Sequence, residues 1–104
     1  MQFDIYLNTD KDTNKTYPYF MDVQSDLLDT LNSRVVIPLT PVKNSRKDYP
    51  KTLCPSIKVQ NKRFALLAHQ ITSVPLSLLR KKAASAESIR SEIVAAIDFV
   101  VTGI

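Results

Sequence analysis

Residues 85–104, with the sequence SAESIRSEIVAAIDFVVTGI, form the one stretch of this chain that has an unambiguous helical period. Its large apolar side chains recur every three or four positions, at Ile89, Ile93, Ile97 and Val100. At about 100° per residue this spacing places them within one narrow arc, which is typical of a helix that packs one face on a core. Val94 and Val101 are expected to widen this apolar stripe on one side.

Both ends of the predicted helix have residues that favour helix ends. Ser85 stands where an N-cap belongs, and Glu87 falls in the first turn, where a negative charge suits the helix dipole. Gly103 is a stop signal at the other end. Asp98 and Phe99 project away from the stripe, so the pattern also fits a helix that presents its tip to a partner.

The residues before this helix are predicted to form about six short strands, over residues 2–8, 18–24, 33–40, 53–60, 63–68 and 70–79. Residues 9–16 are expected to be an exposed, mobile loop, and residues 80–84 a basic linker. Asn61 and Lys62 are expected to form a tight hairpin turn. Pro38 lacks a ladder donor, which favours an edge strand or a bulge at that point. Short strands followed by one helix favour a mainly β fold, a small antiparallel barrel or sandwich.

The composition fits one globular domain and excludes several kinds of site. The chain has 104 residues, of which 44% are hydrophobic and 23% charged, and its net charge is +4. Asp98 interrupts the longest apolar run, so no membrane span is predicted. Cys54 is the only cysteine, which excludes an internal disulfide and a cysteine-based zinc site and indicates the cytoplasm. A single glycine excludes a glycine-rich phosphate loop.

The side chains that could take part in catalysis or bind a metal form no catalytic grouping. His69 is the only histidine, and the sequence around it offers no grouping with an orienting acid and a nucleophile, so a structural role is expected. Cys54 is expected to be buried and inert. Asp22 and Asp26 are too few ligands to predict a metal site, and hydrogen bonding in a turn is the better interpretation. No catalytic residue, metal or cofactor is therefore predicted.

Basic residues occur in three clusters that, with the tyrosines, fit binding of single-stranded RNA. Nothing in the sequence places the clusters on one face, so a solvated surface is the favoured interpretation. The clusters are Lys43, Arg46 and Lys47; Lys62 and Arg63; and Arg80, Lys81 and Lys82.

Five short segments, in this order along the chain, resemble one known protein family. They are Met1-Gln2-Phe3, Asp22-Val23-Gln24-Ser25-Asp26, Val36-Ile37-Pro38-Leu39, Ser73-Val74-Pro75 and Gly103-Ile104. Together they resemble the CcdB family, the toxins of plasmid-type toxin–antitoxin modules that poison DNA gyrase. The resemblance extends from the first residue to the last and implies a single CcdB-like toxin domain over residues 1–104.

The resemblance implies a small SH3-like antiparallel β-barrel with a three-stranded insert and one C-terminal helix, the fold of CcdB and MazF. It implies a homodimer with the two helix tips side by side. Such a toxin is a ligand and not an enzyme: it enters the cavity between the two A subunits of DNA gyrase and stabilises the state that holds cleaved DNA. A CcdA-like antitoxin with a disordered segment would neutralise it. The toxin–antitoxin complex would bind its own operator DNA and the two proteins would together repress the operon, with the antitoxin reading the DNA sequence.

The resemblance also implies a gyrase-binding set, made of Leu27, Leu28, Asp98, Phe99, Thr102, Gly103 and Ile104. Gly103 and Ile104 match the family, and Asp98 stands where the typical member has asparagine. Thr102 departs, because the best-known members have a tryptophan there, and a threonine cannot supply that buried area. Either Phe99 or Ile104 carries more of the binding energy, or the gyrase activity is weak.

Two alternatives stay open. The first is a MazF-like sequence-specific endoribonuclease, which shares the fold and would need a catalytic arginine with a threonine or serine; Arg34 and Thr40 are candidates. The second is a binding module or an inactive descendant of the toxin.

Overall fold

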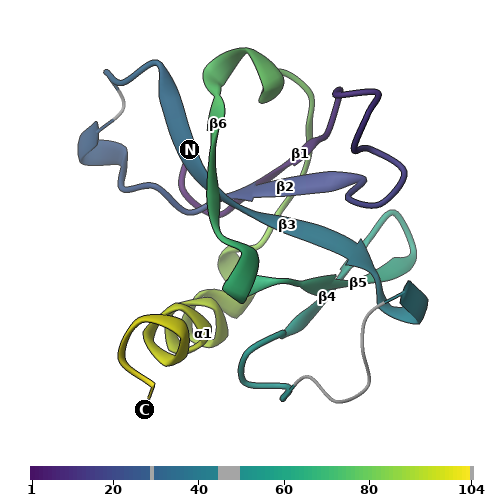
Figure 1. Cartoon of the computed structure of the whole chain (residues 1–104), viewed down its shortest axis with the longest axis vertical. Coiled ribbons are helices and arrows are strands. Elements are labelled where there is room, and N and C mark those ends of the chain that lie inside the picture. The colour runs from purple at the N-terminus through teal and green to yellow at the C-terminus, as the bar shows by residue number, and fades with distance from the viewer. Residues whose placement is uncertain (29, 45–49, 104) are drawn as a thin grey trace.

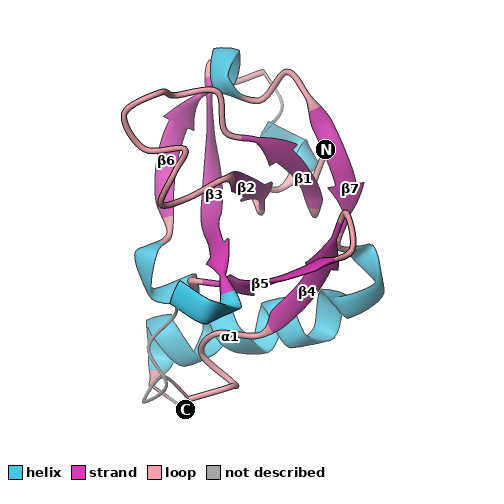
Figure 2. Cartoon of the chain, turned by 90° about the vertical axis from the view of Figure 1, so that its right-hand side faces the viewer, coloured by secondary structure: helices cyan, strands magenta, loops and turns pink. Residues whose placement is uncertain are grey.

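The computed structural model describes residues 1–28, 30–44 and 50–103, which form a curled antiparallel sheet of seven strands and one α-helix. Figure 2 shows the strands curving around a common interior, with the helix running along one end. The elements are β1 (Asp4–Leu7), β2 (Tyr19–Asp22), β3 (Ser33–Pro41), β4 (Ser56–Val59), β5 (Lys62–Leu66), β6 (Thr72–Pro75), β7 (Lys82–Ser85) and α1 (Arg90–Thr102). The predicted mainly β barrel with a C-terminal helix is confirmed.

The long strand β3 organises the sheet, whose order is β4-β5-β3-β2-β1-β7 with β6 also paired to β3. Residues 33–36 of β3 pair with β6, and residues 39–41 pair with β5. Because β3 changes partner part-way along, β4, β5 and the end of β3 form a three-stranded part of the sheet beside the barrel (Figure 1).

Pro38 lies in the middle of this central strand, and so the expectation of an edge strand is wrong. It pairs with Phe20 on the β2 side, while its carbonyl accepts a hydrogen bond of 3.0 Å from the backbone N–H of Leu67. A residue's N–H and C=O point to the same side of a strand, so the donor missing from Pro38 would point towards the gap between β6 and β5. The proline therefore costs no ladder hydrogen bond.

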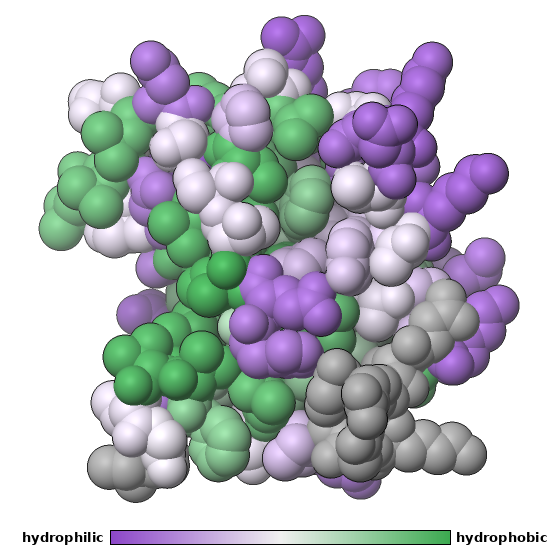
Figure 3. All heavy atoms as spheres, in the orientation of Figure 1, coloured by the Kyte–Doolittle hydropathy of each residue, from purple (hydrophilic) through white to green (hydrophobic). Residues whose placement is uncertain are grey.

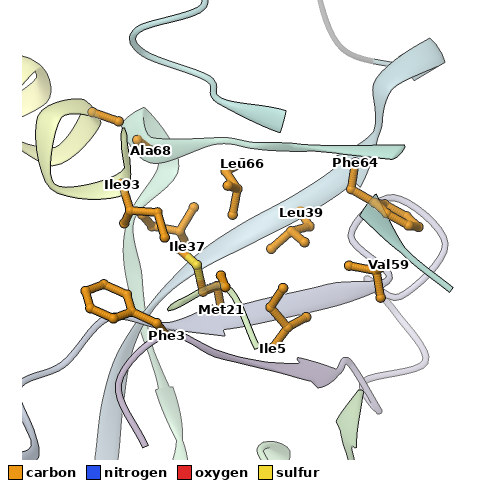
Figure 4. Packing of buried hydrophobic residues seen from close by; sticks show 12 residues of the cluster. Phe3, Ile5, Met21, Ile37, Leu39, Val59, Phe64, Leu66, Ala68 and Ile93 are labelled. Carbon is orange, nitrogen blue, oxygen red and sulfur yellow. The ribbon is translucent and has the colours of Figure 1, made fainter. Parts of the chain in front are cut away.

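The main core fills the space between the sheet and α1. Figure 4 shows Ile93 of the helix pointing towards Ile37 and Ala68, with Phe3 close by. Ile93 is completely buried, and Ile89, Ile97 and Val100 pack around it as the period predicts. The remaining members of this core are Ile5, Met21, Leu39, Val59, Phe64, Leu66, Ala86 and Ala96.

A second, smaller cluster covers the other face of β2. It contains Phe20, Val36, Val74 and Leu79, with Tyr6 packed against it. Strand β2 is therefore buried on both faces, and Asp22, which the alternation placed opposite Met21, is only 1% exposed. A charged residue at such a position needs partners inside the protein.

The boundaries of two elements differ from the prediction. The β4–β5 hairpin turns at Gln60 and Asn61, one residue earlier than expected, and both have positive φ, of 54° and 66°. Two successive left-handed residues are the signature of a tight I′ turn. Residues 82–84, expected to be part of the basic linker, and Ser85, expected to be the helix N-cap, form β7 and pair with β1.

The helix begins later than the N-cap pattern indicates. Residues Glu87–Ile89 form a 3-10 turn, and α1 starts at Arg90. The Ser85 hydroxyl accepts a hydrogen bond of 3.2 Å from the Glu87 backbone N–H. Ser85 therefore stabilises the 3-10 turn and not the first turn of α1.

The polar loop after β1 has an internal anchor that its sequence pattern did not indicate. Asn8 is 1% exposed, and its side-chain amide donates to Thr13 Oγ1 at 3.0 Å and to the Tyr17 carbonyl at 2.8 Å. Its carbonyl oxygen accepts from the Asp10 backbone N–H at 2.9 Å. One buried amide thus fastens both ends of a loop that lacks apolar residues.

Candidate partner-binding site

The end of α1 is closed by a glycine in the left-handed region. Gly103 has φ 74°, and its backbone N–H donates to the Phe99 carbonyl at 3.0 Å, as the predicted stop signal requires. The Thr102 hydroxyl donates to the Asp98 carbonyl at 2.7 Å, so its polar group is turned back onto the helix. These two hydrogen bonds fix the conformation of the end of α1, which we call the helix tip.

This tip is exposed and partly apolar. Asp98, Thr102 and Gly103 are exposed, and Phe99 is half-buried. Val94 and Val101 were expected to widen the buried apolar stripe. This is wrong, because Val101 is 76% exposed and Val94 is 41% exposed. Ile104 lies outside the described residues.

A second exposed apolar area surrounds the 3-10 turn η1 (Asp26–Leu28). Leu27 is 93% exposed, Leu28 is 50% exposed and Leu31 is 48% exposed. The turn is held in place by polar contacts: the Leu27 N–H donates to Ser25 Oγ, and the Gln24 side chain donates to the Leu28 carbonyl. A rigid turn that presents leucines to solvent is typical of a binding surface.

The structure does not bring these two areas together within one chain. In Figure 1 the turn η1 lies at the upper left and the end of α1 at the lower left. Figure 3 shows apolar surface gathered at both places, with an indentation between them. The predicted site residues thus divide into a leucine area, with Leu27 and Leu28, and a helix tip, with Asp98, Phe99, Thr102 and Gly103.

Beneath the leucine area lies a buried ion pair. Arg34 is 4% exposed; its Nη2 lies 2.8 Å from Asp22 Oδ2 and its Nε donates to the same oxygen at 3.0 Å. The guanidinium also donates to the Gln24 carbonyl at 3.2 Å and reaches Asp26 Oδ1 at 3.4 Å. Burial alone would lower the pKa of Arg34, but the hydrogen bonds and charges of Asp22 and Asp26 outweigh it, and that pKa is raised.

This ion pair gives Asp22 and Asp26 a structural role. Within residues 1–28, 30–44 and 50–103, no three acidic, histidine or cysteine side chains are grouped to hold a metal. The two carboxylates instead fix Arg34 and the segment that leads into η1.

The two residues named for an endoribonuclease do not form one site within the chain. Arg34 is engaged in the buried ion pair, and Thr40, 4% exposed, donates its hydroxyl to the Thr16 carbonyl at 2.9 Å. Six positions of β3 separate them, about 20 Å of extended chain. Both side chains stabilise the fold.

Cys54 and His69 are neighbours, with 3.8 Å between Sγ and Nδ1. Cys54 is half-buried, and burial raises the pKa of its thiol, only partly offset by a hydrogen bond from the Ala68 backbone. A raised pKa keeps the thiol protonated near neutral pH, so the geometry offers no activated nucleophile.

The basic clusters are dispersed. Lys43, Lys62 and Arg63 line one cavity, whereas Lys82 pairs with Asp4 at 3.2 Å on β1. Arg80 and Lys81 are exposed just before β7, and Arg46 and Lys47 lie outside the described residues. The basic residues that the structure describes therefore form no continuous face for nucleic acid.

A family model, that of the CcdB protein, matches residues 2–103, nearly the whole chain. The chain belongs to the CcdB family. The members of this family are non-catalytic toxins of toxin–antitoxin systems, and this chain is such a toxin.

Among solved structures the chain is similar to the Mycobacterium tuberculosis toxin MazF-mt6, at 13% identity and a TM-score of 0.66, over 79% of this chain and 83% of that one. At this identity the likeness shows the shared fold alone. In the part of the chain that is described, neither length nor apolarity suits any helix to cross a bilayer.

Asp98 stands near the negative end of the helix dipole, and the last turn of α1 has no basic residue to balance it. We expect Asp98→Asn to raise the free energy of unfolding by about 0.3–0.5 kcal/mol, because it removes this repulsion. Urea denaturation at low salt measures the change. Glu92→Gln, which removes a favourable charge from the first turn, is the matched control and should lower stability. A change of the same sign in both variants would contradict the dipole argument.

Proposed function

We propose that this CcdB-family toxin acts as a homodimer that binds the A subunits of DNA gyrase and traps the complex of gyrase with cleaved DNA. The observation that carries the proposal is the family match over residues 2–103. The exposed helix tip and leucine area support it, because they supply apolar surface at the positions that the family's contacts would occupy.

The proposed mechanism is differential binding. A ligand shifts a conformational equilibrium only by binding one state more tightly than the other. A toxin that fits the opened gyrase dimer and not the closed one holds the cleaved state without any bond being made or broken. Leu27, Leu28 and the helix tip are the contacts we assign to this surface.

A dimer brings together what the single chain separates. The family resemblance implies two helix tips side by side in such a dimer, so the tip residues would be presented twice on one surface. Val101, 76% exposed at the end of α1, is apolar surface that a second copy would cover. In a two-fold arrangement the leucine areas would flank the paired tips and complete one symmetric site.

The proposed regulatory partner is a CcdA-like antitoxin acting in the cytoplasm. Its disordered segment would fold onto the toxin, which provides the exposed apolar surface needed to offset the ordering entropy. Operator DNA would be bound only through the antitoxin in the complex.

Deletion of Gly103 and Ile104 tests the gyrase assignment. We expect loss of toxicity in cells and of gyrase–DNA cleavage complexes in a purified assay, since the tip loses its end. Circular dichroism and the mass of the dimer should remain as in the parent protein, because the backbone N–H of Gly103 bonds to Phe99 of its own helix, and Val101 stays in place for the second copy to cover. Retained cleavage complexes after the deletion would count against this surface.

Thr102→Trp is the gain-of-function control for that assay. A tryptophan at an exposed tip position adds the aromatic area that anchors such interfaces, and we expect about tenfold tighter gyrase binding. Sequence-specific cutting of RNA by the purified protein would instead support the endoribonuclease alternative.

A further inference from the structure

A cavity of about 740 Å³ lies between the start of β2, the end of β3 and the β4–β5 hairpin. In Figure 1 these elements are on the right, whereas η1 and the end of α1 are on the left. The cavity is therefore separate from the proposed gyrase surface. Its volume is in the range of sites that hold a small ligand or an anchoring side chain.

The floor of the cavity is apolar and fixed. Tyr19 and Phe64 pack edge to face, with 5.1 Å between ring centroids and 85° between planes. Val59 and Phe64 are 1% and 5% exposed, so the core holds both in place. The apolar surface that is open to the cavity comes from Val42, 42% exposed, and from the half-buried Pro18 and Tyr19. A preformed apolar floor lowers the cost of ordering a ligand.

The rim of the cavity is positively charged. Lys43, Lys62 and Arg63 contribute to it, and the described lining residues include no aspartate or glutamate. Arg63 donates to Ser56 Oγ at 2.7 Å, which holds its guanidinium along the hairpin. Three cations around an apolar hollow attract an anionic partner and steer it to the opening.

We propose that this cavity binds an acidic linear peptide segment of a partner protein, which inserts one aliphatic side chain between flanking carboxylates. The apolar floor would receive the inserted side chain, and Lys43, Lys62 and Arg63 would pair with the carboxylates. A single-stranded nucleic acid fits less well, because base stacking needs an open ring face. Phe64 is almost fully buried, so its ring face is not open to a base.

Fluorescence anisotropy with a labelled peptide of glutamates around one central leucine tests the proposal. We expect saturable binding to the parent protein, and binding about tenfold weaker when serine replaces the leucine, since one buried leucine is worth that much or more. Lys43→Glu combined with Lys62→Glu should weaken binding at least about tenfold. Both lysines are exposed, so the double variant should keep its fold by circular dichroism.

Arg80→Glu combined with Lys81→Glu is the matched control, because it makes the same charge change at exposed positions outside the cavity. It should leave peptide binding within about twofold. Failure of the parent protein to bind, equal binding of the serine peptide, or equal loss in both double variants would overturn the proposal. Tighter binding of oligouridylate than of the peptide would assign the cavity to nucleic acid instead. The Lys43 and Lys62 variant should still trap gyrase, so this result is independent of the proposed function.

Discussion

Replacing Arg34 by methionine is expected to lower the free energy of unfolding by about 3–5 kcal/mol. The substitution removes the cation that pairs with Asp22 at 2.8 Å, and that carboxylate is 1% exposed. Asp22 would then keep the N-terminal ammonium of Met1, 3.3 Å from Oδ2, as an ion-pair partner, but that group is mostly exposed. The buried carboxylate therefore keeps its desolvation penalty and loses most of its compensation, which costs more than the intact pair. Methionine keeps much of the side-chain volume, so the loss reflects the charge and not a cavity.

Urea denaturation of Arg34→Met, Asp22→Asn and the double variant measures this coupling. The double variant should be more stable than Arg34→Met alone, since it leaves no unpaired charge. Arg63→Met, which removes an exposed arginine on the hairpin, is the matched control and should change stability by less than about 0.5 kcal/mol. Equal effects at positions 34 and 63 would show that the ion pair has no structural role.

The Arg34 network also explains why one of the family-like segments matters. Asp22, Gln24 and Asp26 all contact the guanidinium, the first and third through carboxylates and the second through its carbonyl. These residues form alternate positions of the segment 22–26, which leads directly into η1. The network therefore holds the turn that exposes Leu27. The same ion pair that stabilises the fold also fixes part of the proposed binding surface.

The sequence predicted local structure well where one periodicity dominated. The stripe from Ile89 to Val100 was confirmed because each residue lies on the single face of α1 that meets the barrel. The prediction that Val94 and Val101 belong to the buried stripe was wrong, since a helix at the end of a barrel buries only a narrow arc of its surface. Strand β7 was missed because its four residues, KAAS, show no alternation of large apolar and polar side chains, and only its pairing with β1 makes it a strand.

Burial of polar residues was the other limit of sequence reasoning. Asp22 lies on the face of β2 opposite Met21, and the second cluster around Phe20 covers that face as well. No local pattern reveals that a strand will be covered twice. The burial of Asn8 was not predicted either, because its side chain makes its hydrogen bonds across a loop, to residues that show no local pattern with it.

The candidate site was predicted in composition but not in arrangement. Two adjacent leucines in a turn predict that at least one is exposed, and both Leu27 and Leu28 are. Gly103 ends the helix as expected. Their roles came from the family resemblance, and roles of this kind stay predictions. The two areas lie apart in one chain, and a single sequence has no signal for how a second copy would join them.

The helix tip can work only if α1 is fixed to the barrel, and Ile93 provides the central contact. Ile93 is completely buried in the main core, so Ile93→Ala is expected to cost about 2–5 kcal/mol of stability. The loss combines the transfer free energy of the removed methyl groups with the cavity left beside the sheet. Val94→Ala, one position along and 41% exposed, is the matched control and should cost less than about 1 kcal/mol.

Two measurements separate stability from binding in these variants. In cells, Ile93→Ala should reduce toxicity, because a larger unfolded fraction is degraded. With purified protein under conditions where both variants are folded, trapping of gyrase should match the parent, since Ile93 does not reach the surface. Equal stability losses at positions 93 and 94 would mean that α1 is not anchored through this face. Loss of trapping by a fully folded Ile93→Ala protein would mean that the tip depends on the exact seating of the helix and not only on its attachment.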